Sequence, residues 1–172
     1  MTVHSAYAQV SDDPSAAFEE GNALLEQGRY DEAIESFDKV LAIEPADPDA
    51  LSIKGNSLLR LERYEEAIES FDKALAIEPI DPNTLFNKAF ALSNLNRTQE
   101  ALEYYDRVLA IEPNRVSTLY SKGIALSDLG QRQEAIEFYD RALALDPSNV
   151  DALNNKANAI ASLGESSQPA VY

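Results

Sequence analysis

Apolar residues recur along the chain with the spacing of helices, and the period-2 alternation of strands is absent. Residues 48–81 show the pattern most clearly. A first apolar face repeats at i, i+4 and i+7, and a second face begins after a break near Glu62 and Arg63. The first face consists of Leu51, Gly55 and Leu58, and the second of Ala67, Phe71, Ala74 and Leu75. Pro79 ends the second segment because proline has no backbone N–H to donate. The pattern predicts two helices separated by a short turn.

This two-helix pattern repeats every 34 residues. Two ladders of prolines keep that step, namely Pro45, Pro79, Pro113 and Pro147, and Pro14, Pro48 and Pro82. Ala-Ile-Glu recurs in the same register, starting at Ala33, Ala67 and Ala135. The repeats are therefore predicted over 14–47, 48–81, 82–115 and 116–149, and a fifth copy starts at Val150 and stops halfway. An all-α protein is predicted.

Packing between repeats follows from the same pattern, because one helix pair cannot bury its own apolar residues and needs a neighbour. Small residues are expected where two helices of a repeat cross: Gly21, Gly55 and Gly123, each facing an alanine (Ala33, Ala67 or Ala135). Aromatic residues would fill the space toward the next repeat; they are Phe37, Phe71, Tyr105 and Tyr139. In the half repeat, Leu153, Ala157 and Ile160 are expected to pack inward as a cap. The lysines Lys54, Lys88, Lys122 and Lys156 are expected to hold their heads in water.

The repeats resemble the tetratricopeptide repeat, a helix–turn–helix unit of 34 residues. The family pattern has a large residue at repeat position 4, a small one at 8, a bulky one at 11, alanine at 20, an aromatic at 24, a small residue at 27 and proline at 32. The second repeat matches it with Leu51, Gly55, Leu58, Ala67, Phe71, Ala74 and Pro79. The resemblance covers residues 14–164 and implies an α-solenoid, in which the repeats form a right-handed superhelix.

Three segments lie outside the four complete repeats. Residues 1–13 are predicted to be a flexible N-terminal segment, residues 150–164 a capping helix, and residues 165–172 a flexible tail. Ala6-Tyr7-Ala8 resembles a signal-cleavage site, but no hydrophobic segment precedes it. A cytoplasmic location is therefore favoured, and export is the alternative if Ala6-Tyr7-Ala8 is the remnant of a cleavage site.

Composition removes most catalytic and metal chemistry. The chain has no Cys and a single His, His4, so no imidazole stands beside a nucleophile within the repeats. No glycine-rich phosphate loop or metal-binding motif occurs. The chain is thus not expected to be an enzyme or to need a cofactor or metal. Its formal charge of −16 disfavours nucleic acid and anionic membranes, and it favours neutral or basic partners.

The family resemblance implies a concave groove that is lined by the first helices of successive repeats and holds an extended peptide. The candidate peptide-binding residues are Asn22, Asn56, Phe86, Asn87, Phe90, Tyr120, Ile124 and Asn155. Asparagine can donate to and accept from a peptide backbone, and the apolar members can anchor side chains. The cations with which chaperone-binding relatives clamp a C-terminal carboxylate are missing, so acidic chaperone tails are not expected to bind. We therefore predict a protein-interaction scaffold or adaptor, with a weakly self-associating structural module or a regulatory accessory of a separate enzyme as alternatives.

Overall fold

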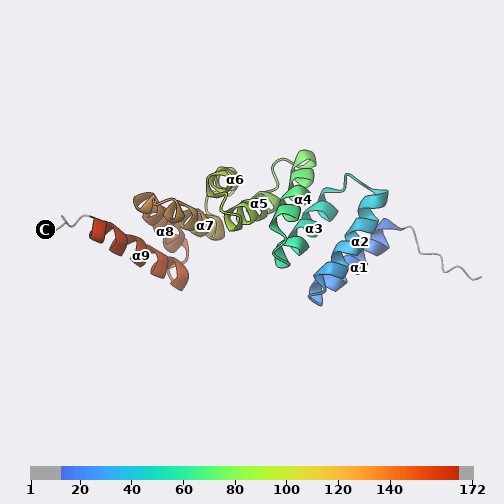
Figure 1. Cartoon of the computed structure of the whole chain (residues 1–172), viewed down its shortest axis with the longest axis horizontal. Coiled ribbons are helices and arrows are strands. Elements are labelled where there is room, and N and C mark those ends of the chain that lie inside the picture. The colour runs from blue at the N-terminus through green and yellow to red at the C-terminus, as the bar shows by residue number, and fades with distance from the viewer. Residues whose placement is uncertain (1–12, 167–172) are drawn as a thin grey trace, which may run out of the picture. The chain divides into compact units, whose positions relative to one another are not determined.

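The computed structural model describes residues 13–166, with side chains to residue 164, and all regular structure in this part of the chain is helical (Figure 1). The helices are α1 (Pro14–Glu26), α2 (Tyr30–Ile43), α3 (Pro48–Arg60), α4 (Tyr64–Ile77), α5 (Pro82–Asn94), α6 (Thr98–Ile111), α7 (Val116–Asp128), α8 (Arg132–Leu145) and α9 (Val150–Ser166). The all-α prediction is confirmed. The predictions for the first twelve residues, including Ala6-Tyr7-Ala8, and for the tail beyond residue 166 fall outside the described residues.

Aspartate–proline pairs start three of the helices. The carboxylate of Asp47 accepts a hydrogen bond from the backbone N–H of Ala50 (3.0 Å), and Pro48 occupies the first helical position. Asp13 and Asp81 cap α1 and α5 in the same way. The cap satisfies a backbone donor that the first turn leaves free, and proline loses nothing there because its missing N–H would have no partner. The proline ladder therefore marks where helices begin as well as where they end.

The chain divides into two compact units, Met1–Ile77 and Glu78–Tyr172. Within the first, α1 packs on α2, α2 on α3 and α3 on α4. Within the second, α5 to α9 pack in the same serial way, and α7 also touches α5 and α9. Consecutive helices in each unit are thus neighbours in space, as expected for stacked hairpins.

Aromatic rings lie over the glycines at the centre of three of the four hairpins. A Cβ added to Gly55 would lie 2.5 Å from Cε1 of Phe71, and one added to Gly123 would lie 2.5 Å from Cε1 of Tyr139. Gly21 meets the ring of Phe37 in the same way. The close approach at these glycines was predicted, but the facing atoms belong to rings and not to alanines. The rings are fully buried, and each one fills the interior of its own hairpin.

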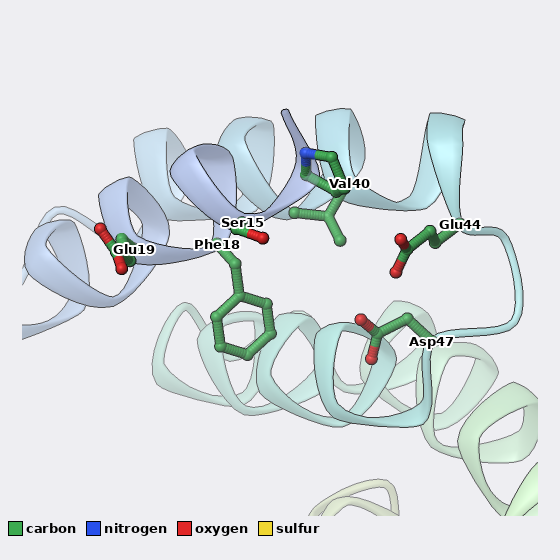
Figure 2. A pocket seen from close by; sticks show the side chains of 7 residues that line it. Ser15, Phe18, Glu19, Val40, Glu44 and Asp47 are labelled. Carbon is green, nitrogen blue, oxygen red and sulfur yellow. The ribbon is translucent and has the colours of Figure 1, made fainter. Parts of the chain in front are cut away.

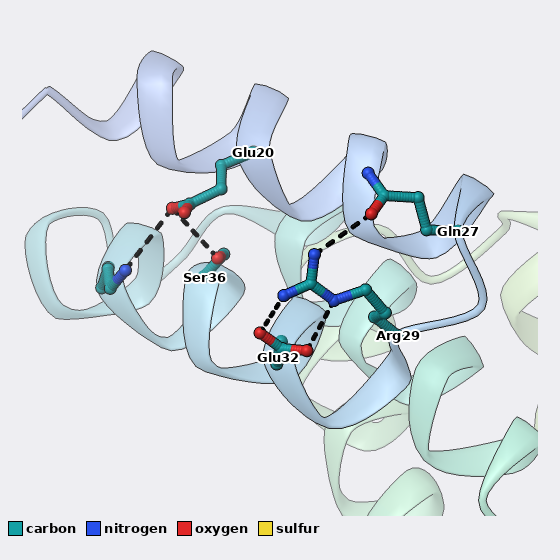
Figure 3. A network of polar contacts seen from close by, with 6 residues as sticks. Glu20, Gln27, Arg29, Glu32 and Ser36 are labelled. Carbon is teal, nitrogen blue, oxygen red and sulfur yellow. Dashed lines mark hydrogen bonds and ion pairs between the residues drawn. The ribbon is translucent and has the colours of Figure 1, made fainter.

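Polar contacts join the helices at the rim of this core. In the first hairpin, Glu20 accepts from Ser36 and pairs with Lys39, while Arg29 pairs with Glu32 and donates to Gln27 (Figure 3). Such exposed pairs contribute little to the stability of the fold, because water screens the charges.

The sequence analysis predicted that the lysines at repeat position 7 extend their ammonium groups into water. In the structure these groups have partners on neighbouring helices instead. Lys54 Nζ lies 2.5 Å from Asp38 on the preceding hairpin, and Lys156 Nζ lies 2.5 Å from Asp140. Lys122 pairs with Asp106 in the same way; its side chain is largely buried, and its Nζ lies 4.4 Å from the centroid of the Phe138 ring. Each pair spans sixteen residues, so these lysines help to fix one hairpin on the next. Lys88 is buried too, and its Nζ donates to the Tyr104 hydroxyl at 2.5 Å.

The half repeat differs from prediction. Leu153, Ala157 and Ile160 were expected to pack inward, but all three are exposed on α9. The residues that α9 buries are Ala152 and Ala159. The reason is geometric: the predicted residues occupy positions that face the second helix in the complete repeats, and no described helix covers them on α9.

Candidate binding surface

The second compact unit carries an apolar depression of about 230 Å³ between α5 and α7. Phe90, Ile124 and Ala125 supply its apolar lining, and Tyr105 from α6 lines it as well. Its rim is polar and is formed by Ser93, Asn94, Ser121 and Asp128. Phe90 is 43% exposed although it is a large apolar residue in the middle of a helix. An apolar floor with one carboxylate at the rim suits a hydrophobic side chain with a donor or a cation beside it.

Three of the residues that line this depression, Ser93, Tyr105 and Ser121, share a hydroxyl network. The hydroxyls of Tyr105 and Ser93 are 3.5 Å apart, and Ser121 also bonds to Tyr105. Burial raises the pKa of the Tyr105 phenol, and the bonds to Ser93 and Ser121 oppose that shift. The ring is therefore a neutral, fixed wall of the site at physiological pH.

Tyr120 and Asn155 form the next part of the surface. The side-chain amide of Asn155 donates to the Tyr120 hydroxyl at 3.0 Å, which links α9 to α7. The Tyr120 ring lies 6.1 Å from that of Tyr139, centroid to centroid. Burial raises the pKa of Tyr120, and the charge of Asp151 adds to the effect. Both side chains are half-buried, so they present part of their surface to a partner.

Phe86 and Asn87 complete the candidate residues of the second unit. The Phe86 ring lies 5.9 Å from Tyr105 and is covered by the Arg115 guanidinium at 4.9 Å. This cation–π contact shields a ring that was predicted to be a free anchor. Asn87 is half-buried. The structure therefore brings Phe90 and Ile124 together in one depression, while Phe86 packs on Tyr105 and Tyr120 on Tyr139.

The first unit holds two further depressions. One, of about 260 Å³, lies between α1, the end of α2 and the loop before α3, with Phe18 and Val40 as its apolar lining (Figure 2). In this view Glu44 and Asp47 stand together at one end and Glu19 at the other. The other, of about 230 Å³, is lined by Asn56 with Leu25, Tyr30, Ser57 and Arg60. Asn22 is half-buried on α1 and lines neither of the two.

Tyr105 and Arg115 belong to the site but were not predicted to do so. Tyr105 was assigned to packing between repeats because it lies on a second helix. Arg115 precedes α7 and does not belong to the repeat pattern. It is assigned to the site because its guanidinium lies over the Phe86 ring. Sequence spacing predicts which residues share a helix face. It does not predict which side chains of the neighbouring helix also reach that surface.

Metal-binding clusters and membrane-spanning helices are both absent from the described residues, 13–166. That part of the chain contains no group of three or more His, Cys, Asp or Glu side chains placed to hold a metal ion. None of its helices is both long and apolar enough to cross a bilayer.

Comparison with known proteins adds the family. Sequence models described as "Tetratricopeptide repeat" match residues 4–50, 18–83, 58–123, 116–149 and 138–168. No curated protein matches the chain. Among solved structures, one of MamA is 21% identical with a TM-score of 0.84, covering 88% of this chain and 82% of its own. MamA from Desulfovibrio magneticus RS-1 is 22% identical with a TM-score of 0.79, covering 88% and 92%. YrrB is 24% identical with a TM-score of 0.79, covering 89% and 79%. The helix pairs, their 34-residue register and these matches together place the chain in the tetratricopeptide repeat family.

Proposed function

We propose that the protein is a non-catalytic adaptor that binds an extended peptide segment on its second compact unit, with an apolar side chain of that segment inserted beside Phe90 and Ile124. The tetratricopeptide repeat family supports the general role of a protein-interaction module. YrrB, which shares the fold, is described as a tetratricopeptide repeat protein with an unusual peptide-binding site.

One observation carries the proposal. Phe90 is 43% exposed at the edge of a depression whose other apolar wall is Ile124. Part of the Phe90 side chain is left in water, and covering it with a partner would contribute a fraction of the roughly 1.5–3 kcal/mol that complete burial of such a side chain gives. A contiguous apolar patch rimmed by polar residues is typical of an interaction site.

The charges define the partner further. Asp128 stands at the rim of the depression, and Asp151 lies close enough to Tyr120 to raise its pKa. The chain as a whole carries −16. A segment with an apolar anchor followed by lysine or arginine would satisfy both the depression and its rim, and it would be attracted over longer distances as well.

The proposal can be tested with a displayed library of random twelve-residue peptides and the purified full chain. Wild-type protein should enrich peptides with an apolar residue next to a cation, and Phe90→Glu should reduce their binding at least tenfold. Ile111→Glu is the matched control, because Ile111 is 44% exposed but lies at the end of α6, outside the depression. Enrichment that persists in Phe90→Glu, or that falls equally in Ile111→Glu, would refute a site at Phe90.

A further inference from the structure

The helix α9 exposes an apolar face that the first helices α3, α5 and α7 bury. Leu153 is 48% exposed and Ile160 is 51% exposed, with Ala157 exposed between them. The residues at the same positions of α7 are Leu119, Gly123 and Leu126, and all three are buried. The difference has one source, because α8 covers this face of α7 and no described helix covers it on α9.

The opposite face of α9 packs against α8. Ala152 and Ala159 are buried where α9 packs on α8, and Lys156 pairs with Asp140 at 2.5 Å. The same contacts hold α7 on α6, through Ala125 and the Lys122–Asp106 pair. The helix α9 is therefore a complete first helix of a repeat, and its bare face continues the stack directly.

The covered repeats show which kind of helix fits such a face. Each second helix places a small residue, an aromatic four positions later and a small residue three positions after that over the first helix. In α8 these are Ala135, Tyr139 and Ala142, and all three are buried. The Tyr139 ring sits directly on Gly123. A helix carrying that pattern would place its ring on Ala157, between Leu153 and Ile160.

The chain's own described helices are not available for this role. The alanines that open the pattern in α2, α4, α6 and α8 are Ala33, Ala67, Ala101 and Ala135, and each is fully buried in its own hairpin. A second copy of α9 would bring an aliphatic stripe without an aromatic ring, and two chains of −16 each would repel one another.

We propose that α9 binds an amphipathic helix from a partner protein, neutral or basic in charge, with the pattern small–x3–aromatic–x2–small. This surface is separate from the depression at Phe90, and it takes a helix instead of an extended segment. The bound helix would occupy the position that a second helix holds in the complete repeats.

The probe for this proposal is a labelled peptide with the sequence of residues 132–145 and the change Glu137→Gln, so that its side chains carry no net charge. It is stapled on its outward face so that the cost of ordering the helix is small. Fluorescence anisotropy against the full chain should show saturable binding. A peptide with the change Tyr139→Ala should bind at least tenfold more weakly, since it lacks the ring. The protein variant Leu153→Glu/Ile160→Glu should also lose at least tenfold, and Phe90→Glu should bind as wild type does.

Both changed residues in that double variant are exposed, so the variant should keep its helices, which circular dichroism would verify. Absence of binding at millimolar peptide would overturn the proposal, as would equal binding by the double variant. Light scattering distinguishes a partner helix from a second copy of the chain. A dimer that disappears in Leu153→Glu/Ile160→Glu would mean that a second copy covers α9. A constant monomer mass supports a helix from a partner protein. Loss of peptide-library binding in Phe90→Glu has no bearing on these outcomes, so the two proposals fail separately.

Discussion

The change Gly123→Ala tests the central packing feature of the hairpins. The new methyl carbon would lie 2.5 Å from Cε1 and 2.7 Å from Cδ1 of Tyr139, whereas carbon atoms prefer a separation of about 3.5–4.0 Å. The ring or the helix must therefore move by about 1 Å. Tyr139 is buried and also packs against Tyr120, so it has little room to do so.

Two opposing effects decide the result. Overpacking a core costs about 1–3 kcal/mol, and replacing glycine by alanine inside a helix gains about 1 kcal/mol. We expect a net loss of about 1 kcal/mol for Gly123→Ala. The matched control is Gly164→Ala in α9, where an added Cβ meets nothing within 4 Å and φ is not positive. The same chemical change should there stabilise the protein, by about 0.5 kcal/mol.

Urea denaturation followed by circular dichroism measures the two variants against wild type. Repeat arrays can unfold in parts, so amide hydrogen exchange should be recorded as well: protection should fall in α7 and α8 for Gly123→Ala and rise only in α9 for Gly164→Ala. If Gly123→Ala raised the denaturation midpoint as Gly164→Ala does, the close contact between Gly123 and Tyr139 would be wrong.

Three further predictions concern single residues. Glu62 has φ +58°, where Gly28 and Gly130 stand in other repeats, so Glu62→Gly should raise the urea midpoint by an amount equivalent to about 0.5–1 kcal/mol; a lower midpoint would contradict strain there. Among the described residues, the buried hydroxyl of Thr118 has no hydrogen-bond partner, so Thr118→Val should stabilise by about 1 kcal/mol in the same assay, and destabilisation would reveal an unseen partner. Burial raises the pKa of Tyr139 to about 12 from 10, which favours the protonated native state; this contribution to stability is complete below pH 10 and is lost as the pH rises toward 12. Stability measured between pH 9 and 12 should therefore fall less steeply in Tyr139→Phe than in wild type, and equal slopes would show that another group titrates.

Sequence alone predicted the parts of the fold that depend on local chemistry. Pro79 was predicted to end a helix because proline has no backbone N–H to donate, and the 34-residue period predicted the order of the hairpins. The partners of the lysines were missed, although Asp38 and Lys54 lie sixteen residues apart, as do Asp106 and Lys122. A spacing of sixteen matches no contact within one helix, so it acquires a meaning only once two hairpins are stacked.

The error in α9 has a related physical cause. A repeat pattern shows which residues share a face, and Leu153, Ala157 and Ile160 do share one. Whether that face is buried depends on a second helix, which the pattern of α9 itself cannot supply. The candidate site shows the same limit: Phe90 and Ile124 were predicted from their register, but the wall provided by Tyr105 became visible only in the folded unit.

Comparison among the repeats separates packing from function. Position 9 of the first helices is Asn22, Asn56 and Asn158 in three copies, but Phe90 and Ile124 in the other two. Because the same hairpin forms with asparagine at this position, an apolar residue there is not needed for the fold. The two apolar residues are adjacent copies in one compact unit, line one depression, and leave Phe90 partly in water. An exposed apolar side chain such as Phe90 lowers solubility, and a bound partner would remove that exposed surface from water. The change Phe90→Asn, which introduces the residue found in three other copies, should therefore leave the urea midpoint nearly unchanged while it weakens peptide binding. A large loss of stability would show that Phe90 is a packing residue of the core.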